Sequence, residues 1–204
     1  MPGSKIVHVI DDDVDVRQSL AFLLSSAGLA VRMHESAVAF LKALPEAQDG
    51  CIVTDIRMPE MDGLELQRRL KEMKVDMPVI VITGHGDVHL AVSAMKAGAL
   101  DFIEKPFDDE VLLSSIRSAL ERHDDDRRRQ SKVAEVRARL EALSEREREV
   151  LARLVAGKPN KIIAYELGIS ARTVEVYRAN VMTKMQADSL SDLVRMALTE
   201  GSLA

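Results

Sequence analysis

The chain has 204 residues, is 47% hydrophobic and carries a formal net charge of −5 at pH 7, values that indicate a globular protein with one large or two small domains. The single cysteine, Cys51, excludes an internal disulfide and begins an apolar run, which favours a buried, unreactive thiol. Of these two possibilities we expect two small domains. No apolar stretch approaches the roughly 18 residues needed to cross a membrane, and no signal-peptide core follows the N-terminus. We therefore expect a cytoplasmic protein.

Short apolar runs alternate with helical patterns over the first 120 residues. Because each run is followed by a helix, the pattern predicts an α/β doubly wound sheet of five parallel strands with helices on both faces, in a domain covering residues 1–122. The expected strands lie within 5–10, 29–34, 51–55, 78–84 and 101–105.

A charged segment then replaces the hydrophobic periodicity. Residues 111–120 are helical in pattern, and we assign 123–139 to a charged, helical linker. One narrow apolar stripe runs through its end and beyond, formed by Val133, Val136, Leu140 and Leu143. This stripe suits either a packed edge of the second domain or a coiled-coil seam, and the sequence does not choose between them.

Residues 140–204 have the pattern of an all-α domain of four short helices. Ser144 and Glu147 form a capping box, and Asn160 and Ser170 are the expected caps of the next two helices. The charge balance from 157 to 184 is +3, although the whole chain is acidic. A local basic patch on an acidic protein suggests an anionic partner.

Polar side chains follow the expected strands where each strand ends. Asp11, Asp12, Asp55, Thr83 and Lys105 should therefore meet at one rim of the sheet, where open α/β folds place their functional crevice. An aspartate run after a strand is more often a helix cap or a solvated turn. Together, however, three hard carboxylates suit Mg²⁺, which would relieve their mutual repulsion.

The stretches "VIDDD", "VTDIRMPEMDG", "VITGHGD" and "DFIEKPF" resemble the four signatures of the response-regulator receiver domain, over residues 5 to about 122. The resemblance implies that Asp55 is the phosphoacceptor and that Mg²⁺ is the cofactor. Asp12 would then bind the ion directly, Asp11 mainly through water, and Arg57 through its main-chain carbonyl, beside Asp55 itself.

The same resemblance assigns the remaining receiver residues. Lys105 should pair with the phosphoryl oxygens, Thr83 should hydrogen-bond to them, and Phe102 should swing inward when Thr83 moves. Arg57 and His85 would flank the entrance and tune water access. Asp13 is left as a solvated residue or helix cap, and the Lys105–Pro106 peptide is expected to be cis.

A short helix, a turn containing Gly168 and a longer helix indicate a helix-turn-helix. Helical phase places Val174, Tyr177, Val181 and Met185 on a packing face. The opposite face has two interpretations: it enters a major groove of DNA, or it is an ordinary solvent-exposed polar surface. Its residues are Arg172, Glu175, Val176, Ala179, Asn180 and Thr183.

The segment from 140 to 204 resembles the LuxR-type (NarL-like) DNA-binding domain, although Tyr177 stands where a histidine is common. Glu175, Val176 and Ala179 would face base edges. The phosphate contacts would come from polar or basic side chains, namely Asn160, Lys161, Arg172, Thr173, Arg178 and Lys184.

The joined resemblances imply a two-component transcription regulator rather than an enzyme, with only Mg²⁺-dependent self-phosphorylation and slow self-dephosphorylation. The expected partners are a histidine kinase, promoter DNA, RNA polymerase and a second, phosphorylated copy, with no membrane. Within this class the motifs resemble activators of nitrogen-fixation genes. A dehalogenase-type phosphatase is disfavoured because Arg57 stands where it needs a second aspartate, and an adaptor that binds protein or RNA is the other rival.

Overall fold

The computed structural model describes residues 6–46, 49–84 and 88–199. Contacts divide the chain into two units, Met1–Asp125 and Asp126–Ala204. The division falls inside the segment that was expected to be the linker. Within the described residues, no helix is long and apolar enough to span a membrane.

The first unit is built on a five-stranded parallel sheet, as predicted. Its strands are β1 (Ile6–Ile10), β2 (Ala30–His34), β3 (Gly50–Asp55), β4 (Val79–Thr83) and β5 (Asp101–Glu104). The strand order is β2-β1-β3-β4-β5, so the order reverses beside β1. Neighbouring strands pair in parallel throughout, which brings their carboxyl ends to one rim.

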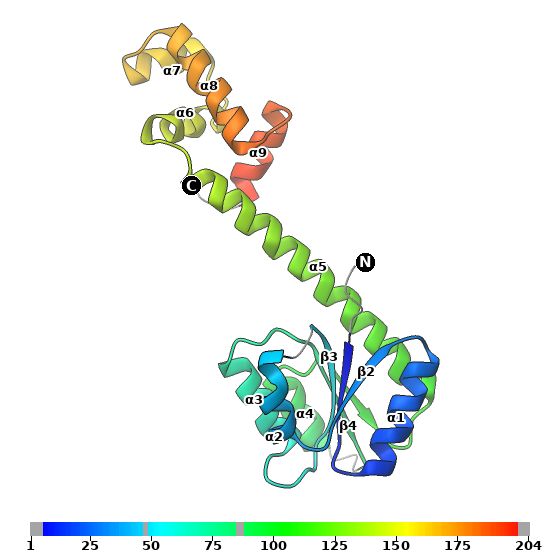
Figure 1. Cartoon of the computed structure of the whole chain (residues 1–204). Helices are drawn as coiled ribbons and strands as arrows, with labels where there is room; N and C mark the ends of the chain where they lie inside the picture. Colours follow the sequence, from blue (N-terminus) through cyan, green and yellow to red (C-terminus); the bar gives the residue numbers. More distant parts are fainter. Residues whose placement is uncertain (1–5, 47–48, 85–87, 200–204) are drawn as a thin grey trace. The chain divides into compact units, whose positions relative to one another are not determined.

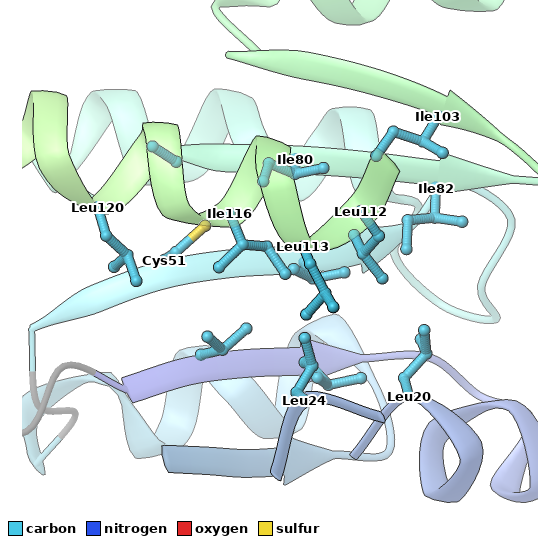
Figure 2. Packing of buried hydrophobic residues seen from close by; sticks show 14 residues of the cluster. Leu20, Leu24, Cys51, Ile80, Ile82, Ile103, Leu112, Leu113, Ile116 and Leu120 are labelled. Atoms are coloured by element: carbon cyan, nitrogen blue, oxygen red, sulfur yellow. The ribbon is translucent and has the colours of Figure 1, made fainter. Parts of the chain in front are cut away.

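Helices cover both faces of this sheet (Figure 1). They are α1 (Val14–Ser26), α2 (Ala37–Ala43), α3 (Gly63–Glu72), α4 (Val88–Ala97) and α5 (Asp109–Glu141), with a short 3₁₀ turn at Leu44–Glu46. One core joins α1 and α5 to the sheet, and Figure 2 shows Leu24 of α1 and Ile116 of α5 pointing toward its strands. A second core joins α2, α3 and α4 to the other face.

Cys51 lies in the first of these cores and has no exposed surface. Burial raises the pKa of its thiol to about 12, because the thiolate would be desolvated there. The surroundings of Cys51 therefore favour the buried, unreactive thiol that was expected from the sequence.

The helix α5 is continuous for 33 residues. It does not stop where the hydrophobic periodicity ends, because the arginine, lysine, glutamine and glutamate side chains of the charged segment are good helix formers on a mostly exposed surface. At its far end, Val136 is buried and Leu140 packs against the core of the second unit. Of the two alternatives for the apolar stripe, the structure therefore favours a packed edge.

The second unit contains the four predicted helices, α6 (Glu145–Val155), α7 (Asn160–Leu167), α8 (Ala171–Met185) and α9 (Leu190–Thr199). The Ser144–Glu147 capping box is present, and Ser170 caps α8. The prediction that Asn160 caps α7 is wrong. Asn160 is the first residue of the helix, and Pro159 occupies the N-cap position, where it makes no side-chain cap because proline has no side-chain acceptor.

Candidate functional site

The carboxyl ends of the strands bring the predicted polar residues together. Asp55 ends β3 and Thr83 ends β4, while Asp11 directly follows β1 and Lys105 directly follows β5. Three of these side chains are largely removed from solvent, because Asp11 is 3% exposed and Thr83 is 1% exposed, and the Asp55 side chain is 12% exposed. The rim is therefore a polar site at the edge of a sheet whose other side chains are mostly buried and apolar.

Lys105 is the centre of this site. Its Nζ donates to Asp11 Oδ2 and to Asp55 Oδ1, at 3.1 Å in each case. Burial lowers the pKa of Lys105, but the bonds and charges of Asp55 and Asp11 outweigh burial and hold that pKa above its usual value. One ammonium thus neutralises charge on two carboxylates that lie far apart in the sequence.

The Asp11 carboxyl is less easily ionised than an ordinary aspartate. Burial raises its pKa, although a bond from the Asp13 amide and the ammonium of Lys105 both favour the charged form. The guanidinium of Arg17 donates to the carbonyl of Asp11 at 2.5 Å and fixes the backbone here. Asp13 is the N-cap of α1 and accepts from two backbone amides, so the cap expected as one of its two roles is present.

The loop after β3 holds the second oxygen of Asp55. Asp55 Oδ2 accepts from the backbone amide of Arg57 at 2.7 Å. The loop then returns so closely that a Cβ at Gly63 would lie 2.4 Å from the carbonyl oxygen of Asp55, so only glycine fits. The Arg57 side chain is exposed at the same place. The "TDIRMPEMDG" motif therefore folds back closely on Asp55 and holds one oxygen of its carboxylate.

The expected magnesium ligands are only partly gathered. Asp11 and Asp55 face Lys105, whereas Asp12 is exposed. In the part of the chain that the structure describes, no three histidine, cysteine or acidic side chains form a metal cluster. Mg²⁺ commonly takes only one or two protein carboxylates and keeps several waters, so the donor set present fits that ion.

Three further predicted residues have different outcomes. The carbonyl of Thr83 accepts from the amide of Lys105 at 2.7 Å, which ties the ends of β4 and β5 together. Phe102 is half-buried in the core on the α4 side, and its inward movement stays a prediction. His85 lies outside the described residues. The Lys105–Pro106 peptide is cis, as predicted.

A groove beside this site was missed by the sequence reasoning. It has a volume of about 800 Å³ and runs along α1 to the loop after β5, where Lys105 and Phe107 line it, and to Asp109 at the start of α5. Phe22 also lines the groove and is 77% exposed. The sequence feature that could have indicated this groove is Phe22, a large apolar residue of α1 that lies outside the buried stripe of that helix. Only Leu20 and Leu24 of α1 are buried.

The second unit presents the helix-turn-helix face that was predicted. Gly168 takes the left-handed conformation between α7 and α8. Val174, Val181 and Met185 are buried, and Tyr177 packs against the same core. The opposite face of α8 is exposed, with Val176 at 56%, and its remaining members are Arg172, Glu175, Ala179, Asn180 and Thr183.

The expected phosphate contacts are less uniform. Lys161 and Arg172 are exposed, and Asn160 and Arg178 are half-buried. The hydroxyl of Thr173 bonds with Ser170 inside the cap of α8. Lys184 has a structural partner, because its Nζ donates to Glu147 Oε2 at 2.7 Å. Its assignment to phosphate stays a prediction, with a competing carboxylate already in place.

Comparison with known families matches both units. Residues 7–117 match the response regulator receiver domain, and residues 141–197 match the luxR family of bacterial regulatory proteins. The two matches divide at α5, the helix that carries the charged segment.

Comparison with individual proteins covers nearly the whole chain. The chain is 60% identical to the transcriptional regulatory protein FixJ of Azorhizobium caulinodans, over 98% of this chain and 95% of that protein. The response regulator StyR matches with a TM-score of 0.88 at 40% identity, covering 96% of this chain and 99% of that one. Full-length FixJ from B. japonicum matches with a TM-score of 0.62 at 52% identity, covering 98% of each.

Proposed function

Because the chain belongs to the response regulators, with a receiver domain and a LuxR-type DNA-binding domain, we propose that a histidine kinase phosphorylates Asp55 and thereby controls transcription. The observation that carries this proposal is Lys105, which holds its ammonium 3.1 Å from both Asp55 and Asp11. Such a cation lies where negative charge grows during transfer of a phosphoryl group to Asp55.

The residues of the rim divide the work of the reaction. An Asp55 oxygen attacks phosphorus, the bond from phosphorus to the donor's imidazole nitrogen breaks, and that nitrogen keeps the electron pair. Lys105 stabilises the phosphoryl oxygens, and the Arg57 amide orients the Asp55 carboxylate. The Thr83 hydroxyl then donates a hydrogen bond to a phosphoryl oxygen, and Arg57 and His85 limit the entry of water.

Magnesium belongs to this proposal as the cofactor. Asp11, Asp12, Asp55 and the carbonyl of Arg57 would hold it at the rim. When bound, Mg²⁺ neutralises phosphoryl charge and positions the donor. The chain itself contributes the buried carboxylate of Asp11, whose raised pKa a nearby cation would lower.

The groove along α1 is the surface that we assign to the kinase. It is lined by apolar side chains including Val16 and the exposed Phe22, and it reaches Lys105. An amphipathic helix of the partner can place its apolar face in such a groove. A kinase bound there would bring its phosphohistidine to the edge of the phosphorylation site.

A second face of the receiver would carry the output. Val92 and Met95 of α4 are 45% and 49% exposed, and Val111 of α5 is 52% exposed. We also assign Val88, the first residue of α4, to this face from its place in the sequence, since its side chain lies outside the described residues. We assign the face to a dimer that forms after phosphorylation, because pairing two helix-turn-helix domains on two half-sites strengthens DNA binding without new contacts.

The dimer would bind promoter DNA and recruit RNA polymerase as an activator. Glu175, Val176 and Ala179 are assigned to base edges, since they lie on the exposed face of α8. Nitrogen-fixation genes are the proposed targets, on the strength of the similarity to FixJ proteins.

The test compares two aspartates of the same rim. Asp55→Asn removes the nucleophile, whereas Asp13→Asn keeps the cap of α1, because asparagine caps helices as well as aspartate does. With acetyl phosphate and Mg²⁺, the Asp13→Asn protein should acquire acid-labile phosphate and the Asp55→Asn protein should not. Acid-labile phosphate on Asp55→Asn would overturn the proposal.

A further inference from the structure

One buried polar side chain of the receiver has no hydrogen-bond partner among the residues that the structure describes. Gln67 of α3 is 4% exposed, and neither Oε1 nor Nε2 of its carboxamide bonds to any residue that the structure describes. Buried amides are almost always satisfied, because losing water without a replacement is costly. Something outside the described residues is therefore expected to supply a donor and an acceptor here.

Gln67 lines a cavity of about 320 Å³ between the ends of α3 and α4 and the start of β4. The cavity lies at the opposite end of β4 from Thr83, so it is separate from the phosphorylation rim. Leu70, Val79 and Leu100 are among its apolar walls. Gly98 also lines it, and a Cβ at that position would lie at ordinary van der Waals distance, 3.9 Å, from Gln67 Nε2.

The rim of the cavity is mainly basic. Lys71 and Lys74 line it and are exposed, and Asp76 is the single acidic residue of the lining. Neither lysine forms an ion pair with any residue in the described ranges. The site thus combines an inner carboxamide, apolar walls and an outer positive charge.

We propose that this cavity binds an adenine mononucleotide. A carboxamide pairs with adenine through two hydrogen bonds, donating from Nε2 to ring N7 and accepting at Oε1 from the 6-amino group. The apolar walls take the faces of the base, and Lys71 and Lys74 take the phosphate. The volume lies at the small end of ligand sites, which suits one nucleotide and not a dinucleotide.

The carboxamide atoms have almost no exposed surface, so the Gln67 side chain must turn to present them to the cavity. That rotation breaks no hydrogen bond with the described residues, because the amide makes none with them in this arrangement. A residue held by neighbours would resist the same movement. The missing bonds therefore make Gln67 available to a ligand.

The experiment titrates AMP into the full-length chain and follows the side-chain NH₂ signals of glutamine by ¹H–¹⁵N NMR. Gln67→Leu identifies the Gln67 signal by its loss, and this variant should fold, because it removes an unsatisfied polar group. AMP should shift the Gln67 signal, and Gln67→Leu should weaken AMP binding about tenfold. Phosphorylation of the same variant by acetyl phosphate should be unchanged.

Two controls separate the parts of the ligand. IMP carries an oxygen where AMP carries the 6-amino group, so it should bind about tenfold more weakly than AMP to the wild-type chain. Lys71→Gln should weaken AMP but leave adenosine unaffected, because only AMP carries the phosphate. These differences also distinguish base recognition from general attraction of an anion.

Either of two results would overturn the proposal. AMP at millimolar concentration could leave the Gln67 signal in place, with cross-peaks only to water, which would make the cavity a hydration site. Alternatively, Gln67→Leu could bind AMP as tightly as the wild-type chain, which would show that the carboxamide takes no part in binding. Both results leave the assignment of Asp55 intact.

Discussion

Replacing Lys184 with methionine should destabilise the helical unit, because it removes the counter-charge of a buried carboxylate. Glu147 has a side chain only 4% exposed, and its Oε2 accepts from Lys184 Nζ and from the amide of Ser144, at 2.7 Å in both cases. Methionine keeps most of the apolar stem of lysine. The main change is therefore the loss of the ammonium.

The expected cost lies between two known limits. Exposed ion pairs contribute about 0–1 kcal/mol, whereas removing one partner of a fully buried pair costs about 3–5 kcal/mol. The Lys184 side chain is 43% exposed, and the start of α6 and the Ser144 amide still favour the Glu147 charge. We therefore expect a loss of about 2 kcal/mol, or about 10 °C in Tm for a unit of this size.

Tyrosine fluorescence follows this unit alone. The chain has two tyrosines and no tryptophan, and Tyr165 and Tyr177 both belong to the helical unit. Thermal unfolding of the full-length variant can therefore be compared with that of the wild-type chain without separating the units. A Glu147→Gln/Lys184→Met double variant should recover about 1 kcal/mol, because its buried amide needs no counter-charge.

Acid provides a second check with a defined sign. The bond from Lys184, with the amide of Ser144, holds the pKa of Glu147 below its usual value. The stability that the pair contributes is thus present above the pKa of unfolded glutamate, about 4.3, and is lost as the pH falls through the folded value. The Tm difference between wild type and Lys184→Met should shrink in that range.

Two results would refute this reasoning. A Tm of Lys184→Met within 1–2 °C of the wild type, roughly 0.3 kcal/mol, would mean that Glu147 does not depend on the ammonium. A double variant no more stable than the single one would mean that the lost energy comes from packing. If instead Lys184 contacts DNA phosphate, the folded variant should lower the salt dependence of DNA binding by about one unit of slope.

Four further outcomes are expected. Lys105→Met should slow phosphorylation of Asp55 by acetyl phosphate about a hundredfold, as measured on phosphate-affinity gels, because a preorganised cation is lost. Phe22→Ser should reduce phosphotransfer from the kinase but not from acetyl phosphate; equal loss from both donors would remove the kinase from the groove. Met95→Asp should keep the phosphorylated chain monomeric in sedimentation, and a dimer of that variant would exclude the α4 face. Burial lowers the pKa of His34 to about 4, and the positive charges of His8 and Arg32 add to this shift. Because the unfolded chain then binds an extra proton between pH 6.5 and 4, the free energy of unfolding should fall by about 2 kcal/mol over that range. His34→Gln should remove this pH dependence.

Local sequence patterns were enough to predict most strands and helices and, for α8, which side of the helix is buried. The five strands and the helices follow from periodicity and caps, and the buried and exposed sides of α8 follow from helical phase. The meeting of Asp11, Asp55 and Lys105 also followed, because parallel strands place their carboxyl ends at one rim. Asn160 was misassigned because asparagine is a good cap in isolation, whereas Pro159 occupies the N-cap position of α7 and Asn160 is the first helical residue.

The sequence by itself determined which residues could meet, because the place of a polar residue at the end of a strand and the phase of a helix are properties of short segments, and parallel strands share one rim. Only the tertiary structure decided which groups those residues actually bond or leave unbonded. Lys184 was expected at DNA and is paired with Glu147, 37 residues away, and Gln67 shares the buried face of α3 with Leu66 and Leu70 but has no hydrogen-bond partner among the described residues. Both outcomes depend on how helices from distant parts of the chain pack against one another. No local pattern specifies this packing, because a polar side chain bonds only to a group that the packing brings within hydrogen-bond distance.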